Sequence, residues 1–127
     1  MLQYAQGYEA DIVIAGCTEE LNGTISEVLY NNLDEGLYID EKLYKELYPK
    51  MINMGIFSQF GIYSYFCNKI FKPNLITRVQ MDVDNNIFMA EDAACTYPAI
   101  LKAKIIYVKH SAKYHYRERF NSMVKSR

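Results

Sequence analysis

The sequence predicts an α/β fold (mixed α+β), in which short buried strands alternate with helices in a single domain over residues 1–127. Three observations carry this prediction. Half of the 127 residues are hydrophobic and 14% are aromatic, which is enough for a sizeable core. Apolar runs of strand length alternate with stretches whose apolar residues recur at helical spacing. No internal repeat, low-complexity tract or obvious linker divides the chain.

The first thirty residues predict a helix, a buried strand and a hairpin. Apolar residues at i, i+3, i+4 and i+7 indicate a helix over residues 1–8, namely Met1, Tyr4, Ala5 and Tyr8. Residues 11–16, DIVIAG, are typical of a buried strand that ends at Gly16. Asn22-Gly23 favours a tight turn, which would lead into a second hairpin strand over residues 24–30.

The middle of the chain predicts two helices. Asp40 or a neighbour could cap a helix whose face is marked by Leu43, Leu47 and Met51. Pro49 interrupts that pattern, so we expect a kink or two shorter helices there. The aromatic-rich residues 58–71 are expected to be helical, with Pro73 breaking or redirecting the helix.

The last third predicts one helix and two strands. Residues 91–103 indicate a helix with Ala94, Tyr97 and Leu101 on one side and a bend at Pro98. The short runs 105–108 and 114–117 are typical of strands. The chain as a whole is therefore expected to hold a few strands and about four helices.

Charge and cysteine content exclude several classes of protein. Residues 102–127 carry eight bases and one acid, a net +7, against −8 (six bases, fourteen acids) for residues 1–101. The basic end could attract a diphosphate or anionic lipid headgroups at the inner face of a membrane, or simply offset the acidic remainder. The net negative charge of the whole chain and the lack of a nucleic-acid-binding motif argue against DNA or RNA as a partner. Three widely spaced cysteines and no signal peptide favour the cytoplasm.

Glu91-Asp92 is the main candidate for chemistry, and two interpretations compete. Acidic residues in the first turn of a helix accept orphan N–H bonds and complement the helix dipole. However, the pair follows the apolar residues 87–90, where burial is expected. A buried carboxylate needs a partner or has a shifted pKa, which suits a general base.

Two further clusters carry polar groups of functional type. Asp82-Val83-Asp84 is a D-x-D, which can hold a divalent cation, but a solvated turn is the simpler interpretation. In a strand over residues 114–117, His115 and Arg117 would project from one face and the two tyrosines from the other. A His beside an Arg can contact phosphate, although a tyrosine-packed strand with a solvent-reaching Arg is the more common structure.

Four segments follow one another along the chain: YEADIVIAG (8–16), CNKIFKPNLI (67–76), MAEDAACTYPAILKAKIIYV (89–108) and YHYRERFNSM (114–123). In this order they resemble the C-terminal, acceptor-side half of family 2 glycosyltransferases, which have the GT-A fold. The resemblance implies a partial GT-A-like domain that lacks the N-terminal nucleotide-binding half. It also implies transfer of a sugar from a nucleotide-sugar donor to a glycan or lipid-linked acceptor hydroxyl.

The resemblance also assigns residues. Asp92 matches the general base, with Glu91 beside it, and Ala90 stands where the family has glycine. The basic residues of the tail and of the CNKIF segment are implied to lie near the donor diphosphate: His115, Arg117, Arg119 and Lys69. The family uses manganese or magnesium, but its D-x-D site has no match here, since Asp84 lies only eight residues before Asp92.

The resemblance implies a fragment, and two expectations follow. Without a donor half, the 127 residues alone are expected to have weak or no activity, and an exposed sheet edge would favour a homodimer. The alternative function is a non-catalytic module that binds a glycan or a protein through its tyrosines.

Overall fold

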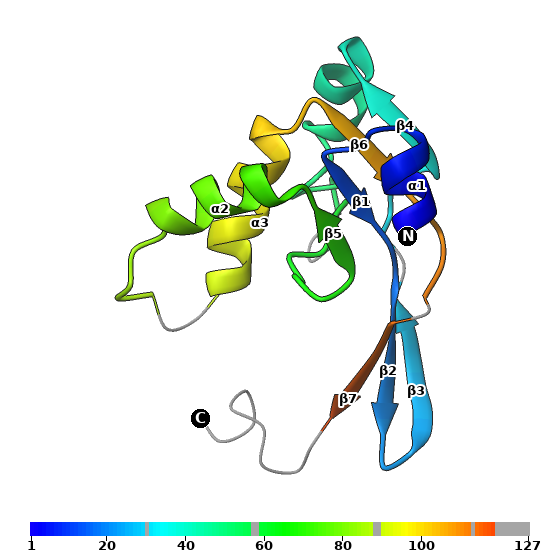
Figure 1. Ribbon diagram of the computed structural model, residues 1–127. Coiled ribbons are helices and arrows are strands. Elements are labelled where there is room, and N and C mark those ends of the chain that lie inside the picture. Colours follow the sequence, from blue (N-terminus) through cyan, green and yellow to red (C-terminus); the bar gives the residue numbers. More distant parts are fainter. Residues whose placement is uncertain (30, 57–58, 88–89, 113, 119–127) are drawn as a thin grey trace.

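The computed structural model describes residues 1–29, 31–56, 59–87, 90–112 and 114–118, and Figure 1 shows how the elements are arranged. The described residues form four helices and seven strands in two mixed sheets, which confirms the mixed α/β prediction. In chain order these are α1 (Leu2–Gly7), β1 (Ile12–Ile14), β2 (Cys17–Leu21), β3 (Thr24–Leu29), β4 (Gly36–Ile39), the π-helical turn η1 (Leu43–Leu47), β5 (Lys69–Phe71), α2 (Pro73–Asp82), α3 (Glu91–Lys102), β6 (Ile105–Val108) and β7 (Tyr114–Glu118).

The first sheet has the strand order β4-β6-β1-β5 and contains the predicted buried strand at its centre. β1 runs parallel to β6 and antiparallel to β5, and all three of its side chains are buried. A strand with both neighbours paired and both faces covered is expected to be apolar throughout, as Ile12, Val13 and Ile14 are. Burying each of these side chains contributes about 1.5–3 kcal/mol.

Helices α2 and α3 lie side by side next to this sheet, and α1 lies beside β1 and β6 (Figure 1). The core joins β1 and β6 to the buried face of α3. That face consists of Cys95, Thr96, Ala99 and Ile100. The predicted face was partly wrong, because Leu101 is 55% exposed while Ala94 and Tyr97 are half-buried.

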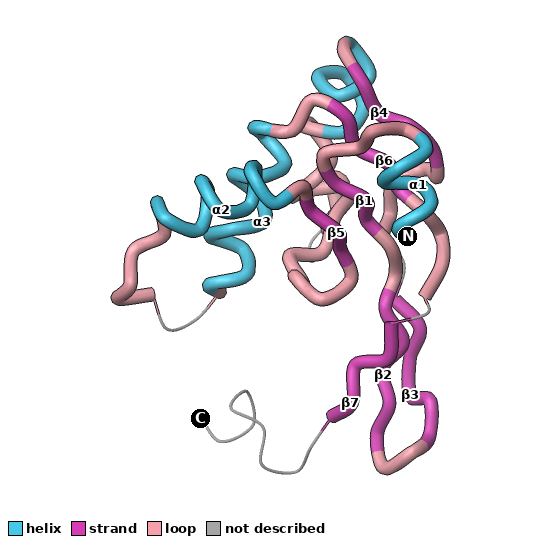
Figure 2. Tube along the Cα trace, in the orientation of Figure 1, coloured by secondary structure: helices cyan, strands magenta, loops and turns pink. Residues whose placement is uncertain are grey.

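The second sheet, β3-β2-β7, projects from the first, and Figure 2 shows its three strands apart from the helices. The predicted hairpin is confirmed: Asn22 and Gly23 both have positive φ, which matches the turn that suits the strand twist. β7 runs parallel to β2, pairing Tyr114 with Cys17 and His115 with Thr18. Sheet edges are formed by β4 and β5, and by β3 and β7, and dimerisation through an edge stays a prediction.

The helix predicted over residues 58–71 is wrong. The described residues 59–68 form no helix, and residues 69–71 form β5. Gly61 packs so closely against the backbone of Lys50 that its amide donates to the Lys50 carbonyl, at 3.0 Å. Pro73 begins α2 instead of ending a helix, because a proline at the first helical position lacks only an N–H that would have no helical partner.

The helical pattern through Met51 is interrupted before Pro49, as expected, but no second helix follows over residues 48–56. η1 ends at Leu47, two residues before Pro49, and it buries Leu43 and Leu47 against the core. Over the described ranges, no helix has the length and apolar character needed to cross a membrane.

Candidate functional site

The site forms around the backbone of residues 62–66, which we call the 62–66 segment. This segment has no regular strand or helix, so its carbonyl groups need side-chain donors. Two of them come from α3: Thr96 Oγ1 donates to the Ser64 carbonyl (3.0 Å) and the Tyr97 hydroxyl donates to the Ile62 carbonyl (3.0 Å). The segment is therefore fixed by tertiary contacts, which explains why its own sequence did not reveal its structure.

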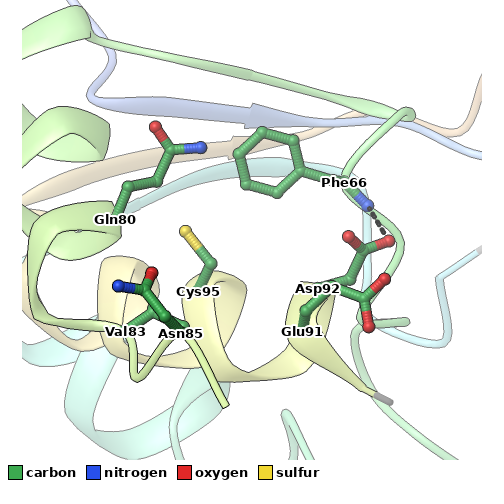
Figure 3. Close-up of a pocket in the computed structure, with 7 residues that line it drawn as sticks. All are labelled: Phe66, Gln80, Val83, Asn85, Glu91, Asp92 and Cys95. Atoms are coloured by element: carbon green, nitrogen blue, oxygen red, sulfur yellow. Dashed lines mark hydrogen bonds between the residues drawn. The ribbon is translucent and has the colours of Figure 1, made fainter. Parts of the chain in front are cut away.

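Asp92 joins the same arrangement from one helical turn before Thr96. Its Oδ2 accepts a hydrogen bond from the Phe66 amide at 3.4 Å, as Figure 3 shows. Residues four apart lie on one face of a helix, so Asp92 and Thr96 both reach the 62–66 segment. The helix-start interpretation also holds, because Glu91 and Asp92 occupy the first turn of α3.

The expected burial of the acidic pair is not observed: Glu91 and Asp92 are both exposed. Of the apolar residues expected to bury them, Ile87 is itself 40% exposed, and residues 88 and 89 lie outside the described residues. Ala90, which precedes the pair, adopts the left-handed conformation with φ of 57°. Glycine adopts this conformation without strain, whereas alanine does not.

Both carboxylates line a pocket of about 280 Å³ between α2, α3 and the 62–66 segment (Figure 3). Its lining combines apolar and polar side chains: Phe66, Gln80, Val83, Asn85, Glu91, Asp92 and Cys95. A concave surface with a few polar groups on an apolar base is typical of a small-molecule site, at the lower end of the usual size.

Lys69 lies on β5 on the inner side of the segment and is 7% exposed. Its ammonium donates to the Tyr63 carbonyl (2.7 Å), the Tyr65 carbonyl and Asn68 Oδ1 (2.7 Å). Burial lowers the pKa of Lys69 to about 7, while the ionisable groups Cys67 and Asp92 act in the opposite direction. All three of its N–H donors are used inside the protein, so this conformation leaves none for the diphosphate contact that the sequence suggested.

The tail residues lie away from this cluster. Paired residues of neighbouring strands share a face, so His115 and Arg117 lie with Thr18 and Glu20, as the alternation predicted. His115 Nδ1 is hydrogen-bonded to Glu20, and Arg117 Nε lies 3.6 Å from the same carboxylate. The hydrogen bond from His115 lowers the pKa of Glu20. Arg119 lies outside the described residues.

The opposite face of the second sheet does connect to the site. Tyr114 and Tyr116 pair with Cys17 and Glu19 there. Tyr114 interacts with the Cys67 thiol, which also feels the charge of Asp92. The resemblance named the tail's basic residues for the site, but among the described tail residues Tyr114 is the one shown to interact with Cys67, next to the 62–66 segment.

The described residues offer no set of three or more His, Cys, Asp or Glu side chains that could hold a metal ion. In the D-x-D, Asp82 is 3.7 Å from Lys102, and Asp84 Oδ1 accepts from both the amide and the side chain of Asn86. This is the solvated turn that the sequence favoured. The described residues therefore offer no site that fits the divalent cation implied by the resemblance.

Comparison of the chain with protein-family models, with curated proteins and with solved structures gives no match. The likeness to glycosyltransferases therefore rests on the four sequence segments alone.

Proposed function

We propose that this chain forms the acceptor side of a GT-A-like, sugar-transferring enzyme in which Asp92 is the general base. The observation that supports this most is the position of Asp92: an exposed carboxylate at the rim of a pocket, oriented by one backbone amide. A base that must reach a bound hydroxyl needs both access and a fixed direction. Glu91, on the same pocket, would bind the acceptor.

The step has a simple balance. An acceptor hydroxyl in the pocket attacks the anomeric carbon of a nucleotide-sugar, forming the new glycosidic C–O bond. The bond between that carbon and the diphosphate oxygen breaks, and the nucleoside diphosphate leaves with the bonding electrons. The hydroxyl proton passes to the Asp92 carboxylate. General-base assistance of this kind contributes about 10²–10⁴-fold in rate.

A second candidate, a non-catalytic glycan-binding module, is favoured by exposed tyrosine side chains on the 62–66 segment and on β7. Tyr63 and Tyr65 stack with ring centroids 5.9 Å apart. Tyr65, Tyr114 and Tyr116 are 37–42% exposed, with Tyr65 interacting with Tyr116. Flat tyrosine rings with a hydroxyl at one end suit the apolar faces and hydroxyls of sugars.

The test is a transfer assay on the protein as the gene encodes it, with a panel of UDP-, GDP- and dTDP-hexoses and simple hexoside acceptors. The variant is Asp92→Asn, whose amide oxygen can still accept from Phe66. We expect transfer to fall by about 10²-fold or more. The control is Glu41→Gln, an exposed acid paired with Lys45 on the surface, which should leave transfer unchanged. Full transfer by Asp92→Asn would refute the assignment.

The same preparation separates the two candidates. Saturable binding of an oligosaccharide without transfer from any nucleotide-sugar, unchanged in Asp92→Asn, would favour the binding module.

A further inference from the structure

Lys69 and Asp92 hold the same short stretch of backbone from two sides. The Lys69 ammonium donates to the carbonyls of Tyr63 and Tyr65, and the Asp92 carboxylate accepts from the amide of Phe66. The two charged groups belong to different elements, β5 and α3, and both are hydrogen-bonded to the 62–66 segment. If the loss of one group moves the 62–66 segment, the hydrogen bond between the other group and the segment should therefore change too.

The buried ammonium also needs a counter-charge. Three described groups act on Lys69 electrostatically: Cys67 two residues before it, Cys17 at the start of β2, and Asp92 on α3. Burial raises the pKa of Cys17 and of Cys67, so both thiols are neutral near pH 7. Among these described groups, Asp92 is then the one that supplies negative charge to a cation held in the interior.

We propose that Lys69 is a positioning residue for Asp92: its ammonium fixes the 62–66 segment against α3 and so keeps the Phe66 amide where Asp92 Oδ2 accepts from it. Calling Asp92 the base rests on the proposed function, whereas the coupling of the two groups does not. Lys69 then acts on the candidate acceptor pocket without touching any ligand in it.

This coupling has a direction that can be measured. Because burial brings the pKa of Lys69 to about 7, the ammonium loses its proton within an accessible range of pH. A neutral amine no longer attracts Asp92, and it holds the two carbonyl groups less strongly. The amide of Phe66 should therefore report the ionisation of Lys69, although Phe66 carries no titrating group.

The experiment is an NMR titration of the folded chain between pH 5.5 and 8.5, with ¹³C-labelled lysine and a ¹⁵N-labelled backbone. It follows the Lys69 side chain and the Phe66 amide in the unmodified chain, in Asp92→Asn and in the control Asp84→Asn. Asp84 caps an exposed turn and is not among the groups that act on Lys69. Neither substitution changes the size of the side chain.

We expect Lys69 to titrate near neutral pH and its midpoint to fall in Asp92→Asn by at least twofold in proton affinity, about 0.3 pH unit. The Phe66 amide, whose peptide group includes the Tyr65 carbonyl bonded to Lys69, should show the same midpoint in the unmodified chain and follow it in Asp92→Asn, whereas a lysine that only held the segment would keep its midpoint in that variant. Asp84→Asn should leave both midpoints in place.

Equal Lys69 midpoints in Asp92→Asn and Asp84→Asn, or a Phe66 amide that does not respond, would overturn the proposal. This failure is distinct from failure of the proposed function. A transfer assay in which Asp92 is dispensable removes the enzyme assignment and leaves the coupling intact, and a missing coupling leaves the assay result as it stands.

Discussion

Substituting Ala90 by glycine is expected to stabilise the protein, in contrast to the effect of glycine inside a helix. Ala90 has φ of 57° and ψ of 28°, a left-handed conformation that costs a residue with a Cβ about 1–2 kcal/mol. Glycine removes this cost but loses more backbone entropy on folding, about 0.5–1 kcal/mol. The net expectation is a gain of about 0.5–1 kcal/mol in the free energy of unfolding.

Urea unfolding followed by circular dichroism measures this difference, and in thermal unfolding the midpoint temperature should rise by roughly 2–5 °C. The matched control is Ala93→Gly, three residues later inside α3, where the backbone is helical and the same change should destabilise by about 1 kcal/mol. Both variants make the same exchange of alanine for glycine, so opposite changes in stability must come from the different backbone conformations of residues 90 and 93. Destabilisation by Ala90→Gly equal to that of Ala93→Gly would refute the reasoning from φ.

Three further outcomes follow from single contacts. Gly61→Ala should destabilise by about 1–3 kcal/mol, because its Cβ would lie 2.1 Å from the Lys50 carbonyl oxygen, whereas Gly7→Ala, with nothing within 4 Å, should not destabilise; equal urea midpoints for the two would contradict this. Asp11→Asn should lose about 1–3 kcal/mol, because Asp11 Oδ2 accepts from the amides of Lys104 and Ile105 and Oδ1 lies 3.1 Å from Lys72. Burial raises the pKa of Asp11, but these contacts lower it by more. The contribution of Asp11 to stability is therefore present above about pH 4 and is lost on acidification, so the stability of Asp11→Asn should depend less on acid pH than that of the unmodified chain. For Lys69 the pH dependence of stability has the opposite sign to that of a cation stabilised by a partner. Its pKa is about 7 in the folded chain and 10.5 in the unfolded chain, so the unfolded chain binds more protons above pH 7. The free energy of unfolding in urea should therefore rise by about 1 kcal/mol from pH 7 to 8, and a fall would contradict the burial of the Lys69 charge.

Local signals predicted those elements whose structure depends on nearby residues. Asn22-Gly23 determines its turn through its own backbone preferences, and Ile12–Ile14 is apolar because both faces of β1 are covered. The alternation of tyrosines with His115 and Arg117 was also readable, because side chains of a strand point to alternate faces.

Long-range contacts decided the parts that the sequence did not reveal. The 62–66 segment is aromatic enough to suggest a helix, yet its backbone groups are bonded to side chains some 30 residues away, including Thr96 and Tyr97. β4 was missed because GLYI, although it contains Tyr and Ile, is only four residues long and becomes a strand by pairing with β6. The candidate site was predicted only in part for the same reason. The sequence named both Asp92 and Lys69, but nothing in their spacing showed that both bind the 62–66 segment.

The contacts of Asp92 also suggest how its structural and chemical roles can be separated. Thr96 is fully buried and its hydroxyl is 3.0 Å from the Ser64 carbonyl, so Thr96→Val should leave this partly buried carbonyl without its donor and cost about 1–3 kcal/mol. Asp92 is exposed, its hydrogen bond to Phe66 is long at 3.4 Å, and Asn keeps an acceptor there, so Asp92→Asn should change stability by less than about 0.5 kcal/mol. If Asp92 served only to hold the 62–66 segment, its substitution would weaken the fold and any ligand binding together. A variant that keeps its urea midpoint while losing transfer places the role of Asp92 in the chemistry, whereas a loss of stability as large as that of Thr96→Val would make it a structural residue.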